Sequence, residues 1–319
     1  MDPSSEVILD YPIFRIYKDH HVDRLVGTET VPAGADAATG VVSKDVVIDD
    51  DSGIYVRLYL PDMAGTQANE DGPKLRVLVF LHGGGFITES AASPMYHNYV
   101  NSLAAAARVL VVSVNYRLAP EHRFPTGYED SLRALKWALS GGDPWLSRHG
   151  DLGRVFLAGD SAGGNIIHNV AMMAAAAGDG GGVAARIEGA VLLHAAFAGK
   201  EPVAGESVET AEMMDTLWGV ICREAAEDGL DDPRINPLAA AAPSLRGLPF
   251  ERLLVVEADG DFFRGRGRAY YEAVVASGWG GEVEWFETMG KEHVFFLLDP
   301  GCPEAVALMA RLVAFFAGN

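Results

Sequence analysis

The hydrophobic positions of the chain fall into short apolar runs that alternate with longer stretches of helical spacing. Six runs are too short for helices and are bounded by Gly, Pro or polar residues, which favours buried parallel strands. They lie at 77–81, 109–114, 155–158, 190–193, 253–256 and 283–286. Apolar and polar residues alternate over 54–60, which predicts a half-buried strand, and 46–48 is its expected antiparallel partner across the turn at 49–53.

Helical patterns occupy the stretches between these runs. Four apolar residues from Tyr128 to Leu139 share one face of a predicted helix, and Thr126 with Glu129 forms a capping-box pattern in front of it. Further helices are predicted at 162–177, 264–277 and 304–316. Because strands and helices alternate from about residue 76 onward, we expect an α/β fold with a mostly parallel central sheet of about eight strands and helices on both faces.

The organisation of the 319 residues predicts a single catalytic domain, 1–319. The stretches 174–185 and 199–205 are rich in Ala, Gly or Pro and are expected to be loops. Between 197 and 249 the pattern is helical, including 211–226, with no strand-like run. We expect this insertion and about the first 40 residues to form a cap over one end of the sheet.

Charge and composition exclude several classes of function. A formal net charge of −19 without a basic patch argues against nucleic-acid partners and against anionic membrane surfaces. Cys222 and Cys302 lie in no metal-ligand or disulfide spacing, so no metal is expected. No apolar stretch is long enough for a membrane span, and the start of the chain lacks the pattern of a signal peptide, which predicts a cytoplasmic location.

The pentapeptide Gly159-Asp160-Ser161-Ala162-Gly163 matches G-x-S-x-G. It directly follows a predicted strand and directly precedes a predicted helix, which is the context of a nucleophile elbow that exposes the hydroxyl of Ser161. The alternative is a phosphate-binding turn. It is disfavoured because the chain has neither G-x-G-x-x-G nor a Walker lysine in this position.

A second glycine motif, His82-Gly83-Gly84-Gly85-Phe86, directly follows the strand predicted at 77–81. Acyl transfer builds negative charge on the former carbonyl oxygen, and closely approaching backbone N–H groups stabilise it. We expect an oxyanion hole of Gly83, Gly84, Gly85 and Ala162, in which Gly83 shapes the turn and the other three donate their N–H groups. Asp160 and His82, beside these motifs, are expected to bond loop backbone.

A nucleophilic serine needs a general base and an acid that orients the base. Enzymes with a nucleophile elbow supply these residues in the chain order Ser, Asp or Glu, His. His194 and His293 both follow Ser161 in the sequence. His194 comes too early to leave room for the acid and is expected to be a core or pocket residue, so His293 is the predicted base. Spacing alone leaves Glu257, Asp259 and Asp261 open as the acid.

These motifs together resemble the plant carboxylesterases, in the hormone-sensitive-lipase branch of the α/β-hydrolases. The resemblance covers nearly the whole chain. The matching segments are Phe14-Arg15-Ile16-Tyr17-Lys18-Asp19, Val42-Ser43-Lys44-Asp45-Val46, His82-Gly83-Gly84-Gly85-Phe86, Tyr116-Arg117-Leu118-Ala119-Pro120-Glu121, Gly159-Asp160-Ser161-Ala162-Gly163-Gly164-Asn165 and His293-Val294-Phe295.

The resemblance implies an α/β-hydrolase fold with a helical cap and selects Asp261 as the acid. In this family the acid opens an Asp-apolar-apolar-x-x-x-Gly stretch, which here is Asp261-Phe262-Phe263-Arg264-Gly265-Arg266-Gly267. The chain departs from the usual pattern at Gly260, where relatives carry Lys. Gibberellin receptors have lost the histidine that corresponds to His293, and hydroxyisoflavanone dehydratases commonly carry Thr at the position of Ser161, so both residues favour hydrolysis here.

The predicted function is a serine carboxylesterase that cleaves short-chain or small-molecule carboxylic esters through an acyl-enzyme, without a cofactor. The catalytic residues are expected to be Ser161, Asp261 and His293. Two alternatives stay open: a hormone-like receptor without turnover, and a dehydratase or lactone-forming lyase in the same pocket. The expected partner is a small ester, and the protein is expected to be a monomer or a homodimer.

Overall fold

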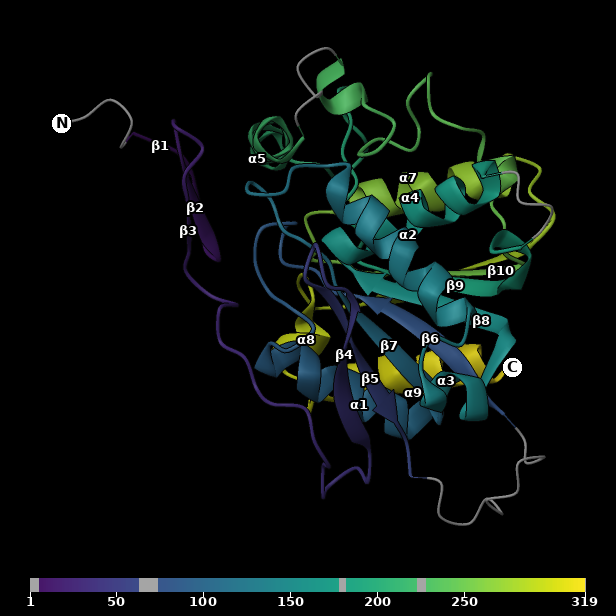
Figure 1. The fold of residues 1–319 in the computed structure, drawn as a ribbon. Helices are drawn as coiled ribbons and strands as arrows, with labels where there is room; N and C mark the ends of the chain where they lie inside the picture. The colour runs from purple at the N-terminus through teal and green to yellow at the C-terminus, as the bar shows by residue number, and fades with distance from the viewer. Residues whose placement is uncertain (1–5, 63–73, 178–181, 223–227, 319) are drawn as a thin grey trace.

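Eight strands form one central sheet in the computed structural model, which describes residues 6–62, 74–177, 182–222 and 228–318 (Figure 1). The strand order is β11-β10-β9-β8-β6-β7-β5-β4. The strands are β4 (Val42–Asp49), β5 (Ile54–Leu60), β6 (Leu75–Leu81), β7 (Leu110–Asn115), β8 (Gly150–Asp160), β9 (Ile187–Leu193), β10 (Arg252–Ala258) and β11 (Glu282–Thr288).

The six strands β11, β10, β9, β8, β6 and β7, in this order across the sheet, are each parallel to their neighbours. β5 is antiparallel to both of its neighbours, β7 and β4. All eight predicted strands are confirmed, together with the antiparallel opening pair. Most of the strands run past their apolar runs, because backbone pairing continues into polar positions. For β8 the apolar run covers only 155–158 of the eleven residues of the strand.

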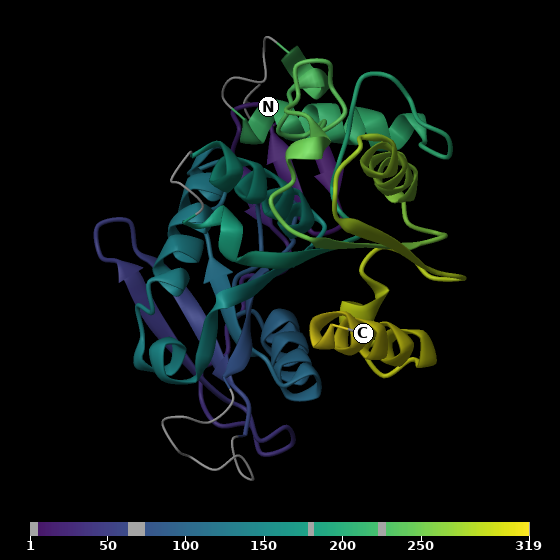
Figure 2. The ribbon, with the colours of Figure 1, turned by 90° about the vertical axis from the view of Figure 1, so that its right-hand side faces the viewer.

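Helices cover both faces of this sheet. Side chains of adjacent residues in a strand point to opposite faces, so Val79 belongs to one hydrophobic core and Phe80 to the other. The core around Val79 includes residues of α2 (Thr126–Leu139), α3 (Pro144–His149), α4 (Ala162–Ala176) and α7 (Arg264–Ala276). The core around Phe80 includes residues of α1 (Pro94–Ala107), α8 (Phe295–Leu298) and α9 (Pro303–Ala317), and Figure 2 shows α1 and α9 side by side.

The predicted capping box at the start of α2 is wrong. Pro125 occupies the N-cap position, no side chain caps the helix, and Thr126 is already helical. The Thr126 N–H donates to the carbonyl oxygen of Arg123 at 3.1 Å, so the preceding turn leads directly into the helix. Thr126 therefore lies inside the first turn, one residue too late to cap it.

The N-terminal segment and the insertion after β9 lie against each other. The first forms a small antiparallel sheet of β1 (Val7–Tyr11), β2 (Phe14–Tyr17) and β3 (Val22–Arg24), and β1 contacts α5 (Val208–Ile221) (Figure 1). The insertion also carries the 3₁₀ turns η3 (Gly229–Asp231) and η4 (Leu245–Gly247), while η2 (Ala184–Arg186) precedes β9. Parts of the predicted helix at 211–226 and of the predicted loop at 174–185 lie outside the described residues.

None of the helices in the described ranges is long and apolar enough to cross a membrane.

Candidate active site

Ser161 lies in a sharp turn between β8 and α4. Its φ of 51° and ψ of −117° are unusual for a residue with a side chain. Both flanking glycines are required by close approach, because a Cβ on Gly163 would overlap the carbonyl oxygen of Leu81 and one on Gly159 would overlap Gly163. The G-x-S-x-G motif thus allows the turn that brings the serine above the end of the sheet.

The structure brings Ser161, His293 and Asp261 into one hydrogen-bonded chain. Oγ of Ser161 lies 3.0 Å from Nε2 of His293, and Nδ1 of His293 lies 2.7 Å from Oδ2 of Asp261. A carboxylate can only accept, so Nδ1 carries the proton and Nε2 presents a lone pair to the serine hydroxyl, which donates. This is the arrangement in which an imidazole can remove the proton of a nucleophile.

The charge state of Asp261 suits this arrangement. Burial alone would raise the pKa of its carboxyl group, but the charge of His293 and the hydrogen bonds from His194 and His293 outweigh burial and hold the pKa well below its usual range. Asp261 is therefore ionised at neutral pH. Its other oxygen, Oδ1, accepts the N–H of Phe263 at 2.7 Å, which fixes the plane of the carboxylate.

The other two candidate acids lie elsewhere. Oδ1 of Asp259 accepts the N–H groups of Gly290 at 2.6 Å and Lys291 at 3.3 Å, so this residue supports the loop before His293. Glu257 is fully buried, and its pKa is raised well above the ordinary value by burial and then by repulsion from Asp261 and Glu287. Among the described residues neither carboxyl oxygen of Glu257 has a hydrogen-bond partner.

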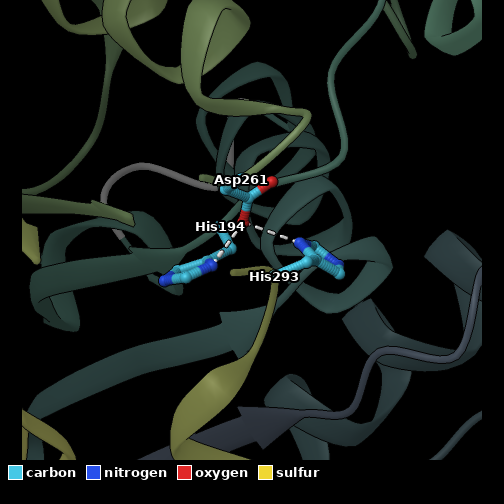
Figure 3. A group of neighbouring side chains, drawn as sticks. All are labelled: His194, Asp261 and His293. Atoms are coloured by element: carbon cyan, nitrogen blue, oxygen red, sulfur yellow. Dashed lines mark hydrogen bonds and ion pairs between the residues drawn. The ribbon is translucent and has the colours of Figure 1, made fainter. Parts of the chain in front are cut away.

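His194 also contacts Asp261, which the sequence interpretation missed. Its Nδ1 lies against the same Oδ2 that His293 contacts, and Figure 3 shows the carboxylate between the two imidazole rings. A signal was available in the strand order. His194 directly follows β9, Asp261 shortly follows β10, and neighbouring parallel strands end at the same edge of a sheet.

Two imidazole nitrogens and a carboxylate oxygen are also a possible ligand set for a divalent metal ion. His194, Asp261 and His293 form such a group within the described ranges. Oδ2 of Asp261 is within hydrogen-bond distance of both nitrogens, which leaves no room for an ion between them. Protons on the two nitrogens account for both contacts.

The loop with the three glycines borders the site. The N–H of Gly83 donates to Oη of Tyr96 at 2.8 Å and to Oδ1 of Asp160 at 3.1 Å, so it serves the loop itself. The N–H groups of Gly84, Gly85 and Ala162 meet no acceptor in the described parts of the chain. Gly84 has a φ of 94°, and a Cβ there would overlap the carbonyl oxygen of Thr88, so only glycine fits.

Asp160 and His82 stabilise the loop that contains Gly83 through hydrogen bonds. The hydroxyl group of Tyr96 donates to Oδ2 of Asp160 at 2.7 Å, and burial raises the pKa of that carboxyl to about 7 even though the Tyr96 bond opposes the rise. Nδ1 of His82 donates to the carbonyl oxygen of Gly83 at 2.9 Å, and burial lowers the pKa of His82 to about 4. Both residues therefore bond loop backbone, as the sequence predicts.

A pocket of about 870 Å³ opens beside Ser161. Its walls come from the turn between β1 and β2, from residues 25–29, from α5 and from the loops that carry Gly84, Phe262 and His293. The lining includes the carboxyl groups of Glu29, Glu89 and Glu292 but no Lys or Arg among the residues described. Most of the wall is apolar, and acidic side chains outnumber basic ones among the lining residues described.

Known proteins resemble this chain over nearly its full length. Residues 78–297 match the protein-family model described as alpha/beta hydrolase fold. The chain is 47% identical to tuliposide A-converting enzyme 2, chloroplastic, of Tulipa gesneriana. The aligned region covers 99% of this chain and 80% of that protein. It is 41% identical to probable carboxylesterase 2 of Arabidopsis thaliana, over 96% of this chain and 94% of that protein. The chain belongs to the plant carboxylesterase family of α/β-hydrolases.

Solved structures agree with this family. The thermophilic carboxylesterase EstE1, from a metagenomic library, superimposes on this carboxylesterase-family chain with a TM-score of 0.71 and 28% identity, covering 90% of each. The hyperthermophilic esterase of Pyrobaculum calidifontis does so with a TM-score of 0.69 and 28% identity, covering 86% of this chain and 84% of that one. The predicted α/β-hydrolase fold is confirmed.

Proposed function

We propose that this protein hydrolyses small carboxylic esters, with Ser161 as nucleophile, His293 as general base and Asp261 as the acid that orients the base. The observation that carries the proposal is the continuous hydrogen-bonded chain from Ser161 through His293 to Asp261, at the wall of a pocket. The relatives named carboxylesterase and the similar esterase structures support the same reaction class.

Acylation begins when Oγ of Ser161 bonds to the ester carbonyl carbon and its proton moves to Nε2 of His293. The ionised Asp261 stabilises the imidazolium that forms. When the tetrahedral intermediate collapses, the bond to the alcohol oxygen breaks and the alcohol takes the proton from Nε2. The acyl group is left on Ser161.

The oxyanion of this intermediate is held by the N–H groups of Gly84, Gly85 and Ala162, which have no acceptor among the described residues. A single donor of this kind contributes roughly 3–4 kcal/mol to transition-state stabilisation. Gly83 keeps the loop in place through Tyr96 and Asp160 and takes no direct part.

Deacylation repeats these steps with water. His293 takes a proton from the water as its oxygen bonds to the acyl carbon, and the same proton returns to Oγ of Ser161 as the acid leaves. No residue besides Ser161, His293, Asp261 and the oxyanion donors is required for proton or charge transfer.

The substrate is proposed to be small because the pocket is covered. Tyr11 of β1, Phe14 of β2 and residues of α5 supply part of the wall, and we propose that the segments at about 1–40 and 197–249 are the cap of a single catalytic domain. We expect acyl chains of about two to six carbons to be preferred, because a cap over the site restricts the room for longer chains. Faster turnover of esters with about twelve carbons or more would count against a closing cap.

The nucleophile is tested by Ser161→Ala. We expect hydrolysis of p-nitrophenyl butyrate to fall by ~10³-fold or more, and a fluorophosphonate to label the wild type only at Ser161. Ser140→Ala, on an exposed serine, is the matched control and should keep full activity. Labelling at another serine, or activity in Ser161→Ala, would refute the assignment.

A second candidate is attack on the acyl-enzyme by a group other than water. It is motivated by the 47% identity to proteins named tuliposide A-converting enzymes, which exceeds the 41% identity to the Arabidopsis carboxylesterase. Turnover in H₂¹⁸O separates the two reactions, because hydrolysis places ¹⁸O in the released acid and internal or alcohol attack does not.

Two further sequence predictions stay predictions. The cytoplasmic location is untested, and the names of the similar tulip enzymes place those proteins in chloroplasts or amyloplasts. Whether the chain is a monomer or a homodimer is likewise untested.

A further inference from the structure

We propose that His194 is a positioning residue of this esterase: its Nδ1–H group holds the Asp261 carboxylate in the orientation that His293 requires. The inference rests on the proposed function, because it assigns a task within the same site. It comes from the contact between His194 and Asp261, which the reaction steps above do not use.

Asp261 has three donors around one carboxylate. Oδ1 accepts the N–H of Phe263, and Oδ2 accepts from Nδ1 of both His293 and His194. The side chains of Asp261 and His194 are fully buried, whereas that of His293 is 16% exposed at the pocket. Water therefore cannot easily replace His194 as the third donor.

The contact fixes the proton on Nδ1 of His194. Asp261 is ionised and can only accept, so the nitrogen facing it must donate. The N–H of Val294 also lies 3.2 Å from this nitrogen, but a protonated Nδ1 has no lone pair left for it. Burial lowers the pKa of His194, so its ring is neutral and has a single proton. A neutral donor stabilises the carboxylate without cancelling the charge that His293 needs.

The backbone at His194 is consistent with a functional constraint. Its φ of 52° lies in the left-handed region, which is unfavourable for a residue with a side chain. The conformation is held by the His194 N–H, which donates to the carbonyl oxygen of Val256 on β10 at 2.8 Å. The turn directly after β9 places the imidazole against Oδ2 of Asp261.

The test compares two substitutions of similar size. In His194→Asn the amide nitrogen takes the place of Nδ1, so the donor is kept. In His194→Leu the donor is lost. We expect kcat for p-nitrophenyl butyrate to fall ~10–100-fold in His194→Leu with little change in KM, and His194→Asn to recover most of it.

The pH profile gives a readout that loss of packing alone would not change. The titratable groups facing Asp261 are His194, His293, Glu257 and, more distantly, Tyr11. Without the donor of His194, the carboxylate charge acts more strongly on His293, and a proton stays there to higher pH. The acid limb of kcat/KM should therefore move to higher pH in His194→Leu and return in His194→Asn.

A double-mutant cycle with Asp261→Asn separates positioning from backbone strain. If His194 acts through Asp261, then adding His194→Leu to Asp261→Asn should lower the residual activity much less than it does in the wild type. An equal loss in both backgrounds, equal damage in His194→Asn and His194→Leu, or an unchanged His194→Leu would overturn the proposal. Should His194→Leu fail to fold, His194→Gln replaces it, because its amide lies one carbon too far out to replace Nδ1.

Failure of this proposal is distinguishable from failure of the esterase assignment. Wild-type activity that disappears in Ser161→Ala establishes the reaction, whatever the His194 variants do. ¹⁵N-histidine NMR of the inactive Ser161→Ala protein reads the His194 tautomer without turnover. The expected signal is a neutral ring protonated at Nδ1, and a proton on Nε2 instead would contradict the inference.

Discussion

Nε2 of His293 lies 3.0 Å from Oγ of Ser161, although 132 residues separate the two in sequence. The contact exists because β8 and β11 belong to the same run of parallel strands and end at the same edge of the sheet, so the turn after β8 and the loop after β11 meet over that edge. A base in this position can activate the hydroxyl only while its lone pair is free.

His293→Val should therefore remove turnover while keeping the fold. Valine retains an apolar side chain of modest size, but the hydroxyl of Ser161 is then a poor nucleophile at neutral pH, and kcat should fall by ~10³-fold or more. Hydrolysis of p-nitrophenyl acetate measures the loss, and an unchanged Tm shows that the fold survives. In the wild type kcat/KM should rise with pH as the imidazole loses its proton. A wild type inactive on every activated ester, with ligand binding unchanged in His293→Val, would favour a receptor instead.

Gly84→Ala should damage the oxyanion hole. The added Cβ would overlap the carbonyl oxygen of Thr88, and the φ of 94° at this position is unfavourable for alanine. We therefore expect the loop to shift and its N–H groups to turn away from the pocket. We expect kcat to fall ~10²–10³-fold with a smaller change in KM. Gly34→Ala is the control, because no atom lies within 4 Å of a Cβ at that position. Equal effects of the two substitutions would exclude a specific role for Gly84.

The inner strands β6 to β10 were predictable because both of their faces are largely buried, which leaves compact apolar runs in the sequence. The small sheet of β1 to β3 was not predictable from the sequence. The residues of β1 are exposed or half-buried and show no clear alternation of apolar and polar positions. Ser161 and His293 were found through motifs and chain order. Motifs and chain order can both be read from the sequence without knowledge of the fold.

The acid and its second partner depend on geometry that spacing does not contain. Asp259 and Asp261 are two residues apart, yet one accepts loop amides at 290–291 and the other faces His293. Only the path of the loop decides between them, and the resemblance to relatives supplied what spacing could not. His194 was assigned to the core or pocket because chain order made it an improbable base. Its contact with Asp261 requires that β9 and β10 be neighbours.

The length of the accepted acyl chain should depend on α5. Leu217 is buried and lines the pocket, so Leu217→Ala adds space at the wall. We expect the preferred p-nitrophenyl ester to shift by about two carbons or more toward longer chains. Val208→Ala, at an exposed position of the same helix, should leave the preference unchanged. No shift in Leu217→Ala would mean that the acyl group lies elsewhere.

The charge of the pocket should exclude anionic esters. Glu29, Glu89 and Glu292 line it without a Lys or Arg among the described lining residues. We expect kcat/KM to be ~10-fold or more lower for p-nitrophenyl hydrogen glutarate than for p-nitrophenyl pentanoate, which has an uncharged chain of similar length. The difference should shrink at high salt and in Glu29→Gln, which removes the charge of an exposed lining residue. Equal rates for both esters in the wild type would argue against a role of this charge.

Asp160 should make the protein less stable at alkaline than at mildly acidic pH. Burial raises the pKa of its carboxyl group to about 7, whereas an aspartate in the unfolded chain titrates near ~4. The folded state thus binds this proton more tightly, and the resulting stabilisation is complete below about pH 4 and is lost as pH rises through about 7.

Asp160→Asn removes the titration but keeps an acceptor for the Gly83 N–H and a polar partner for Tyr96. The free energy of unfolding of Asp160→Asn minus that of the wild type should therefore increase from pH 5 to pH 8, by on the order of 2–3 kcal/mol. Urea unfolding at both pH values measures the difference, and a value that does not change with pH would show that the carboxyl group titrates as it does in the unfolded chain.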